Sequence, residues 1–138
     1  MATGTLGTSA RDYHTRQTVY INSPVLTSGT GGNFLATQSL KIGTIPAGAS
    51  IRSLLTCTKV ADNAGASLVK VGTSNNAADI FASAAGGFAT AGLTSSTVIQ
   101  AAGNVQVAAD TDIWVTNNSS AAAATSGQTQ FFVEFLVP

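Results

Sequence analysis

The sequence contains few of the residues from which enzyme sites, metal sites and disulfide frameworks are built. It has one histidine and one cysteine, and 9% of its 138 residues are charged, against about 25% in ordinary globular chains. A single imidazole cannot build a catalytic triad or a histidine-rich zinc site, and a single cysteine excludes an internal disulfide. The chain has zero formal net charge and 44% hydrophobic residues. This composition differs from that of disordered chains, which combine low hydrophobicity with high net charge. We therefore expect a folded protein that is not an enzyme and has no cofactor and no metal.

The few charges are unevenly distributed along the chain. All six basic residues precede Val71, whereas four of the six acidic residues follow it. If strands from the two halves interleave in one domain, these charges mix in space. Nucleic-acid binding needs a basic face that neutralises phosphates, with aromatic side chains among the basic ones. The sequence has no such segment, so we expect no nucleic-acid partner.

Two stretches bear on a membrane role. Residues 1–6 are polar and lack the basic start and apolar core of a secretory signal peptide. Residues 80–109 contain no Asp, Glu, Lys or Arg, but they include four glycines and many hydroxyl and amide side chains. Their hydropathy is too low for a spanning segment. We expect no membrane partner.

Strand-like segments separated by turn residues follow one another from residue 18 onward. Residues 18–22 are β-branched and aromatic, which favours a strand, and Pro24 then breaks that strand or confines it to a sheet edge. Further strands are predicted over residues 33–43, 49–60, 67–72, 96–100, 104–108, 112–117 and 129–137. The alanine-rich residues 77–85 are predicted to form a short helical stretch. About eight strands at this spacing predict an all-β protein, an antiparallel β-sandwich of residues 18–138.

Alternation and turn residues predict local details of this sandwich. Within residues 49–60, the side chains that share one face are Ile51, Ser53, Leu55 and Cys57. Cys57 is predicted to be a buried strand thiol, because a free cysteine usually behaves as a small hydrophobic residue. Residues 62–65 predict a hairpin that joins residues 49–60 to residues 67–72. Residues 45–48 predict a turn with proline second and glycine at positive φ.

The last strand is apolar on both faces. Phe131, Val133, Phe135 and Val137 point one way, and Phe132, Glu134 and Leu136 point the other. An exposed strand of this kind would invite edge-to-edge aggregation. We therefore expect it to be central in its sheet or covered by a subunit. Residues 117–127 before it are predicted to be an exposed hairpin connection.

A few residues are candidates for ligand chemistry. Asp110 and Asp112 form a close carboxylate pair, but calcium needs several more oxygens and the D-x-[DN]-x-[DN]-G pattern is missing, so a capped turn is favoured. A glycosidase would need two carboxylates across a cleft, drawn from Asp79, Asp110, Asp112 and Glu134. Trp114 alternates beside Ile113 and Val115, which favours a core position over a sugar-stacking platform.

Four segments resemble the small head-decoration and other accessory virion proteins of tailed bacteriophages. They are residues 45–52, 68–73, 108–115 and 127–138, within a similarity of turns and strand ends that covers residues 34–138. The resemblance implies a jelly-roll-like sandwich on the outside of the virion, made in the host cytoplasm. It also implies a homo-oligomer seated on capsomers of the major capsid protein, as a capsid decoration or cement protein that stabilises the head.

Residues 1–17 lack any periodicity and are predicted to be an extended N-terminal arm. This arm concentrates Arg11, Tyr13, His14 and Arg16, and arginine and tyrosine are frequent in interface hot spots. We expect these four residues to contact the capsid or a neighbouring subunit. The alternative function is a carbohydrate- or receptor-binding β-sandwich of a phage tail or fibre, with Trp114, Tyr13 and Tyr20 as its candidate residues.

Overall fold

The computed structural model describes residues 18–29, 31–61, 68–85, 91–96, 106–118 and 127–137. These residues form antiparallel strands, and no helix among them is long and apolar enough to cross a membrane. The strands are β1 (Thr18–Asn22), β2 (Leu26–Thr27), β3 (Ser39–Ile45), β4 (Ser50–Val60), β5 (Leu68–Gly72), β6 (Phe81–Ala85), β7 (Gly92–Ser96), β8 (Thr111–Asn117) and β9 (Gln128–Leu136). The predicted arm, residues 1–17, lies outside the described residues.

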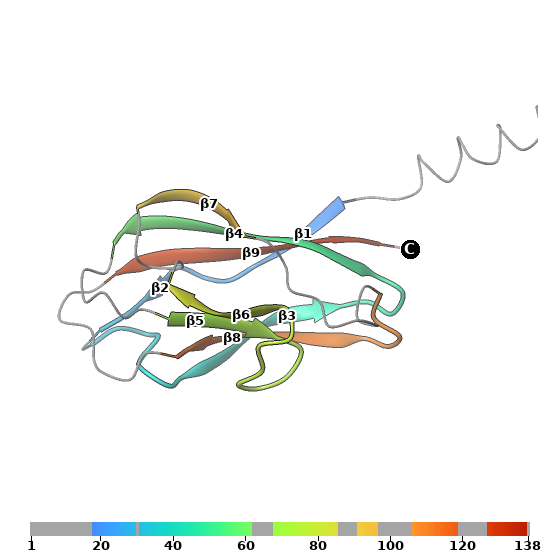
Figure 1. The fold of residues 1–138 in the computed structure, drawn as a ribbon, viewed down its shortest axis with the longest axis horizontal. Coiled ribbons are helices and arrows are strands. Elements are labelled where there is room, and N and C mark those ends of the chain that lie inside the picture. The colour runs from blue at the N-terminus through green and yellow to red at the C-terminus, as the bar shows by residue number, and fades with distance from the viewer. Residues whose placement is uncertain are drawn as a thin grey trace, which may run out of the picture.

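The strands form two sheets that pack face to face. Sheet A has the order β1-β9-β4-β7, with β2 also paired to β9, and sheet B has the order β3-β8-β5-β6. Figure 1 shows the two layers, with β4, β7 and β9 in one and β3, β5, β6 and β8 in the other. Because β1 and β2 follow one another along β9, they occupy one strand position, so each sheet has four positions. This two-sheet Greek-key order is that of a jelly roll, and the predicted jelly-roll-like sandwich is confirmed.

The interruption between β1 and β2 confirms the prediction made for Pro24. Proline has no N–H to donate to a ladder, and β1 ends at Asn22. Ser23 bridges the gap: its N–H donates to the carbonyl of Phe131 at 2.8 Å, and its Oγ accepts from the N–H of Phe131 at 2.9 Å. The broken strand therefore stays attached to β9.

The prediction of two hairpins is wrong. β4 pairs with β7 and β9 in sheet A, whereas β5 pairs with β6 and β8 in sheet B, so the chain crosses between the sheets from β4 to β5. β8 and β9 also lie in different sheets. Turn residues show that the chain reverses, but they do not show whether the next strand joins the same sheet. The predicted turn residues 62–65, and residues 119–126 of the second connection, lie outside the described residues.

A β-bulge in β4 decides which of its side chains face the core. Ile51 pairs with Phe135 of β9, but the next residue of β9, Glu134, pairs with Ser53. Arg52 is therefore an extra residue on β4. One extra residue exchanges the inner and outer faces for everything that follows it.

The bulge corrects two predictions about this strand. The buried side chains of β4 are Ile51, Leu54, Thr56 and Thr58. Leu55 is half-buried on the opposite face, and Cys57 is exposed there. The prediction of one unbroken face through Ile51 and Cys57 is wrong, and so is the prediction of a buried thiol.

Several smaller predictions also differ from the structure. Residues 81–85 are strand β6 rather than helix, because pairing with β5 overrides the helix propensity of alanine. The turn predicted at residues 45–48 lies one residue later: the N–H of Ala49 donates to Pro46 at 3.1 Å, and Gly48 has φ of 83°. Val107 exchanges backbone hydrogen bonds with Gly48 and Ala49, although residues 106–108 form no strand.

The core lies between the two sheets, and β9 is central in sheet A as predicted. The largest fully buried side chains are Phe34, Phe131, Leu26, Ile45, Leu54, Ile80, Ile113, Val69, Val71, Val115 and Val133. They come from both sheets and from both halves of the sequence. The interleaving expected from the charge distribution is thus present: Lys41 of β3 forms an ion pair with Asp112 of β8 at 2.8 Å.

Candidate functional site

An apolar patch on the outer face of sheet A forms the first candidate surface. Its central part is a shallow pocket of about 420 Å³ lined by Tyr20, Asn22, Leu55, Leu93 and Phe132. Leu93 is 73% exposed and Tyr20 is 47% exposed. We call these five residues the apolar face. Large apolar side chains that gather on one exposed face are typical of protein contact sites.

The strand pairing brings the residues of the apolar face into rows. Asn22 of β1, Phe132 of β9 and Leu55 of β4 lie side by side in register. Leu93 of β7 pairs with Cys57 in the next row. The bulge at Arg52 is what places Leu55 and Cys57 on this side of the sheet, so the face depends on an irregularity of one strand.

Glu134 lies beside the apolar face and has protein partners there. It accepts a hydrogen bond from Tyr20 at 3.3 Å and one from Ser53 at 2.9 Å. Desolvation on the sheet, followed by the charge of Glu134 and the hydrogen bond to it, raises the pKa of Tyr20 above its ordinary value. A carboxylate that keeps hydrogen-bond partners loses less when water is removed. A partner protein can therefore cover the face without leaving Glu134 without hydrogen-bond partners.

The outer face of sheet B carries Trp114 among mostly polar side chains, and its carboxylates are also engaged. Asp112 accepts hydrogen bonds from Lys41 at 2.8 Å and from Thr44 at 2.7 Å, and these two hydrogen bonds hold its pKa below the usual range. Asp110 accepts the N–H of Ala47 at 2.9 Å. Asp110, directly before β8, thus caps the turn between β3 and β4, whereas Asp112 lies within β8. Within the described ranges, no three His, Cys, Asp or Glu side chains gather as metal ligands.

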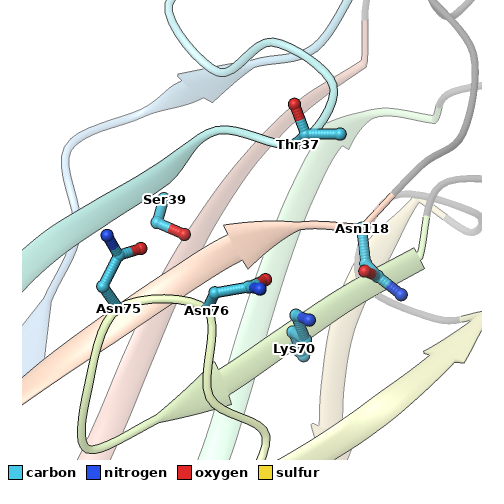
Figure 2. Close-up of a pocket in the computed structure, with 6 residues that line it drawn as sticks. All are labelled: Thr37, Ser39, Lys70, Asn75, Asn76 and Asn118. Carbon is cyan, nitrogen blue, oxygen red and sulfur yellow. The ribbon is translucent and has the colours of Figure 1, made fainter.

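A pocket of about 510 Å³ lies on the same side of sheet B and is the second candidate site. It is lined by Thr37, Ser39, Lys70, Asn75, Asn76 and Asn118. In the view of Figure 2, the amide groups of Asn76 and Asn118 flank Lys70, which rises from β5. We call these six residues the polar pocket. Its described lining residues supply hydroxyls, amides and one ammonium group, and none of these six residues has a carboxylate or an aromatic ring.

The residues predicted from sequence to form a site are distributed differently. Arg11, Tyr13, His14 and Arg16 lie outside the described residues, so their predicted interface role stays a prediction. Trp114 pairs with Lys41 and Gly72 in sheet B and is half-buried between the buried Ile113 and Val115, so it points outward and the predicted core position is wrong. Tyr20 lies on sheet A. Trp114 and Tyr20 thus occupy different sheets and cannot share one sugar site.

Both candidate surfaces contain residues that sequence reasoning missed. Leu55 was predicted to share a face with Ile51, and the bulge that separates the two has no clear signature in the sequence. Leu93 and the lining of the polar pocket come from segments far apart in the chain. The turn-forming pair Asn75 and Asn76 was the available local signal, because asparagine favours turns and tolerates positive φ.

Comparisons with known proteins show the fold of the chain. No protein-family model matches the sequence, and no curated protein matches it. A chain of the cyanophage Pam1 capsid asymmetric unit is similar in structure, with a TM-score of 0.58 and 16% identity over 90% of this chain and 86% of that chain. A chain of the capsid of Ralstonia phage GP4 has a TM-score of 0.57 and 16% identity, with 88% and 83% covered.

A third similar structure comes from another phage. A chain of the acidic stable capsid of Helicobacter pylori bacteriophage KHP30 has a TM-score of 0.51 and 11% identity, over 89% of this chain and 94% of that chain. Because most of each matched chain is covered, the three are comparable in length to this one. The chain therefore has the fold of small chains found in phage capsid structures.

Proposed function

We propose that this chain is a structural virion protein, a decoration or cement protein that binds the outer surface of a phage head and stabilises it. The apolar face carries the proposal. It presents Tyr20, Leu55, Leu93 and Phe132 together, on a sheet that needs no further strand to complete the sandwich core. The fold similarity to chains of three phage capsids supports a role in a virion, and the short length of those chains supports an accessory subunit.

The chemistry of the apolar face suits a permanent protein contact. Aromatic side chains are enriched at the centres of interfaces, whereas lysine and free carboxylates are depleted there. Phe132 supplies the aromatic centre, and Asn22, Ser53 and Glu134 supply a polar margin with Glu134 already hydrogen-bonded. The proposed partner is the major capsid protein, with further copies of this chain beside it. In this role the protein performs no catalysis, and it functions on the capsid exterior after synthesis in the host cytoplasm.

The N-terminal arm is proposed as a second contact. Its predicted interface residues are Arg11, Tyr13, His14 and Arg16. An arm that becomes ordered on binding loses conformational entropy at that step, so its net contribution is smaller than its contact area suggests. The apolar face, which is held by the sheet, does not have this cost.

The test measures retention of purified variants on phage particles that lack the native copy. Leu93→Glu places a charge in the apolar face at a 73% exposed position, and Leu35→Glu is the matched control at a 47% exposed position in the loop before β3. We expect Leu93→Glu to weaken retention by about tenfold or more, because burying an unpaired charge in an interface is costly. Leu35→Glu should bind as the unchanged protein does.

Deletion of residues 2–16 separates the arm from the sheet. We expect near-unchanged thermal unfolding and weaker retention after the deletion. Retention that is lost on deletion but unaffected by Leu93→Glu would assign attachment to the arm alone. Failure of particles to form closed heads without this chain would contradict an accessory role and indicate a shell subunit.

A further inference from the structure

We propose that the polar pocket of sheet B binds an acidic saccharide unit, a hydroxyl-rich ring that carries one carboxylate. The pocket is on the other sheet from the apolar face, so this inference does not depend on how the protein attaches to a capsid. A volume of about 510 Å³ lies within the range of roughly 300–1,000 Å³ typical of small-molecule sites. It accommodates a sugar ring and exceeds what one simple oxyanion fills.

Two four-residue turns form opposite walls of the pocket in the same way. In one, the N–H of Gln38 donates to the carbonyl of Leu35 at 3.0 Å, and in the other the N–H of Ala77 donates to Ser74 at 3.0 Å. The third residue of each turn lines the pocket and has positive φ, at 64° for Thr37 and 65° for Asn76. They are the two non-glycine residues with positive φ in the described part of the chain.

The positive φ of Thr37 is costly because threonine is β-branched. Such a conformation persists where the surrounding structure holds it, and it is found frequently at binding sites. Asn117 holds this wall with three hydrogen bonds. Its carbonyl accepts the N–H of Thr37 at 2.8 Å and its N–H donates to Gln38 at 2.9 Å, while its side-chain amide donates to Phe34 at 3.0 Å.

The wall formed by the loop of Asn75 and Asn76 is held by hydrogen bonds at the two ends of that loop. Asp79 accepts the N–H of Thr73 at 2.8 Å and also its hydroxyl, which closes the loop that carries Asn75 and Asn76. This loop lies directly against β5, since a Cβ on Gly72 would come within 2.6 Å of Ala77. Both walls are therefore built before a ligand arrives, which reduces the ordering cost of binding.

The lining chemistry selects the class of ligand. Asparagine amides and the hydroxyl of Thr37 both donate and accept hydrogen bonds, as sugar hydroxyls do. Ser39 is already hydrogen-bonded to Thr116 at 2.7 Å and forms part of the floor. Lys70 adds one positive charge. Among the described residues Lys70 forms no ion pair, whereas Lys41 pairs with Asp112. A ligand with several hydroxyls and one carboxylate matches this set.

The experiment compares two probes that differ at one carbon. Methyl β-D-glucuronide carries a carboxylate where methyl β-D-glucoside carries a hydroxymethyl group, and both are titrated into the full chain while backbone amide resonances are followed by NMR. We expect the amides of the polar pocket to shift with the glucuronide, and its affinity to exceed that of the glucoside about fivefold at low salt. This preference should shrink at high salt, because the charges are near the surface.

Two substitutions assign the preference to the pocket. Lys70→Gln should abolish the preference for the glucuronide, and Lys59→Gln, at an exposed lysine of β4 in sheet A, should leave it unchanged. Asn76→Gly keeps a backbone that tolerates positive φ and removes the amide, so both probes should bind more weakly. The proposal is overturned if neither probe shifts the pocket amides, if both bind equally, or if inorganic phosphate displaces the glucuronide at equal concentration.

Discussion

The two sheets of the sandwich have similar inner faces and very different outer faces. Sheet A presents Tyr20, Leu93 and Phe132 outward around a shallow apolar pocket. Sheet B presents the Lys41–Asp112 ion pair, the half-buried Trp114 and a pocket whose described lining is polar. The side chains of both inner faces must pack together in one core. The side chains of each outer face need only suit the solvent or the partner that contacts them. The contrast indicates that sheet A is suited to being covered by protein and sheet B to remaining in contact with water and polar ligands.

The largest expected effect separates the inner from the outer face of one strand. Phe131 is fully buried in β9 and Phe132, the next residue, is half-buried on the apolar face. We expect Phe131→Ala to lower the free energy of unfolding by about 3–5 kcal/mol, because it removes core packing and leaves a cavity. Phe132→Ala should cost about 1 kcal/mol, as for a partly exposed site. Urea unfolding of both variants is the measurement.

The same pair sharpens the functional contrast. Phe132→Ala should strongly reduce retention on phage particles although it lowers the free energy of unfolding only slightly, because its ring belongs to the proposed contact. Equal losses of stability for Phe131→Ala and Phe132→Ala would mean that the outer face of sheet A is part of the folding core and not a free surface.

An intermediate effect is expected for the thiol of Cys57. It is exposed on sheet A and pairs in register with Leu93. In the free, folded protein it should react with a thiol reagent without denaturant, since reaction requires access. On phage particles the labelling should slow severalfold, because the proposed partner covers the apolar face.

The control for this labelling lies on the other sheet. Ser74→Cys, in a Cys57→Ser background, places a thiol in the exposed turn beside the polar pocket. It should label at the same rate on and off the particle. Protection of this thiol on the particle, together with an unprotected Cys57 in the unchanged protein, would reverse the assignment of the two faces.

The smallest effect concerns the ion pair of sheet B and its pH dependence. Asp112 has a lowered pKa in the folded protein, whereas an aspartate in an unfolded chain has a pKa of about 3.9. The pair therefore contributes stability that is present above the unfolded pKa and is lost as the pH falls through the lower folded pKa. Both side chains are about half exposed, so the contribution is small.

Unfolding midpoints at neutral pH and near pH 3 measure this contribution. Asp112→Asn should lose less stability on acidification than the unchanged protein, and Lys41→Gln should show a similar but weaker effect because Thr44 still donates to Asp112. An unchanged acid response in both variants would show that the pair does not stabilise the link between β3 and β8.

Much of the fold was predictable because local patterns indicate strands directly. The break at Pro24, the long strand through residues 50–60 and the central, two-sided β9 all follow from β-propensity, proline chemistry and alternation. The helix predicted at residues 77–85 failed because pairing with β5 outweighs intrinsic propensity. The hairpin predicted between β4 and β5 failed because turn residues carry no information on which sheet the next strand joins.

The candidate surfaces were less predictable. The two-sided apolarity of β9 indicated that its outer side would need a cover, but the extra residue at Arg52 moved Leu55 and Cys57 from the inner to the outer face. The polar pocket depends on turns from two distant parts of the chain that meet beside β8. Neither turn carries a ligand-binding motif in its own sequence.

The amino-acid sequence by itself determined that the chain is an all-β sandwich with a neutral, weakly charged surface, because composition and strand periodicity act residue by residue. Only the tertiary structure decided which strands share a sheet and which side chains of β4 face outward. It also decided that Thr37, Lys70 and Asn76 line one pocket. These features depend on pairing between residues far apart in the chain and on one bulge, and a one-residue shift in register changes the face of every side chain beyond it.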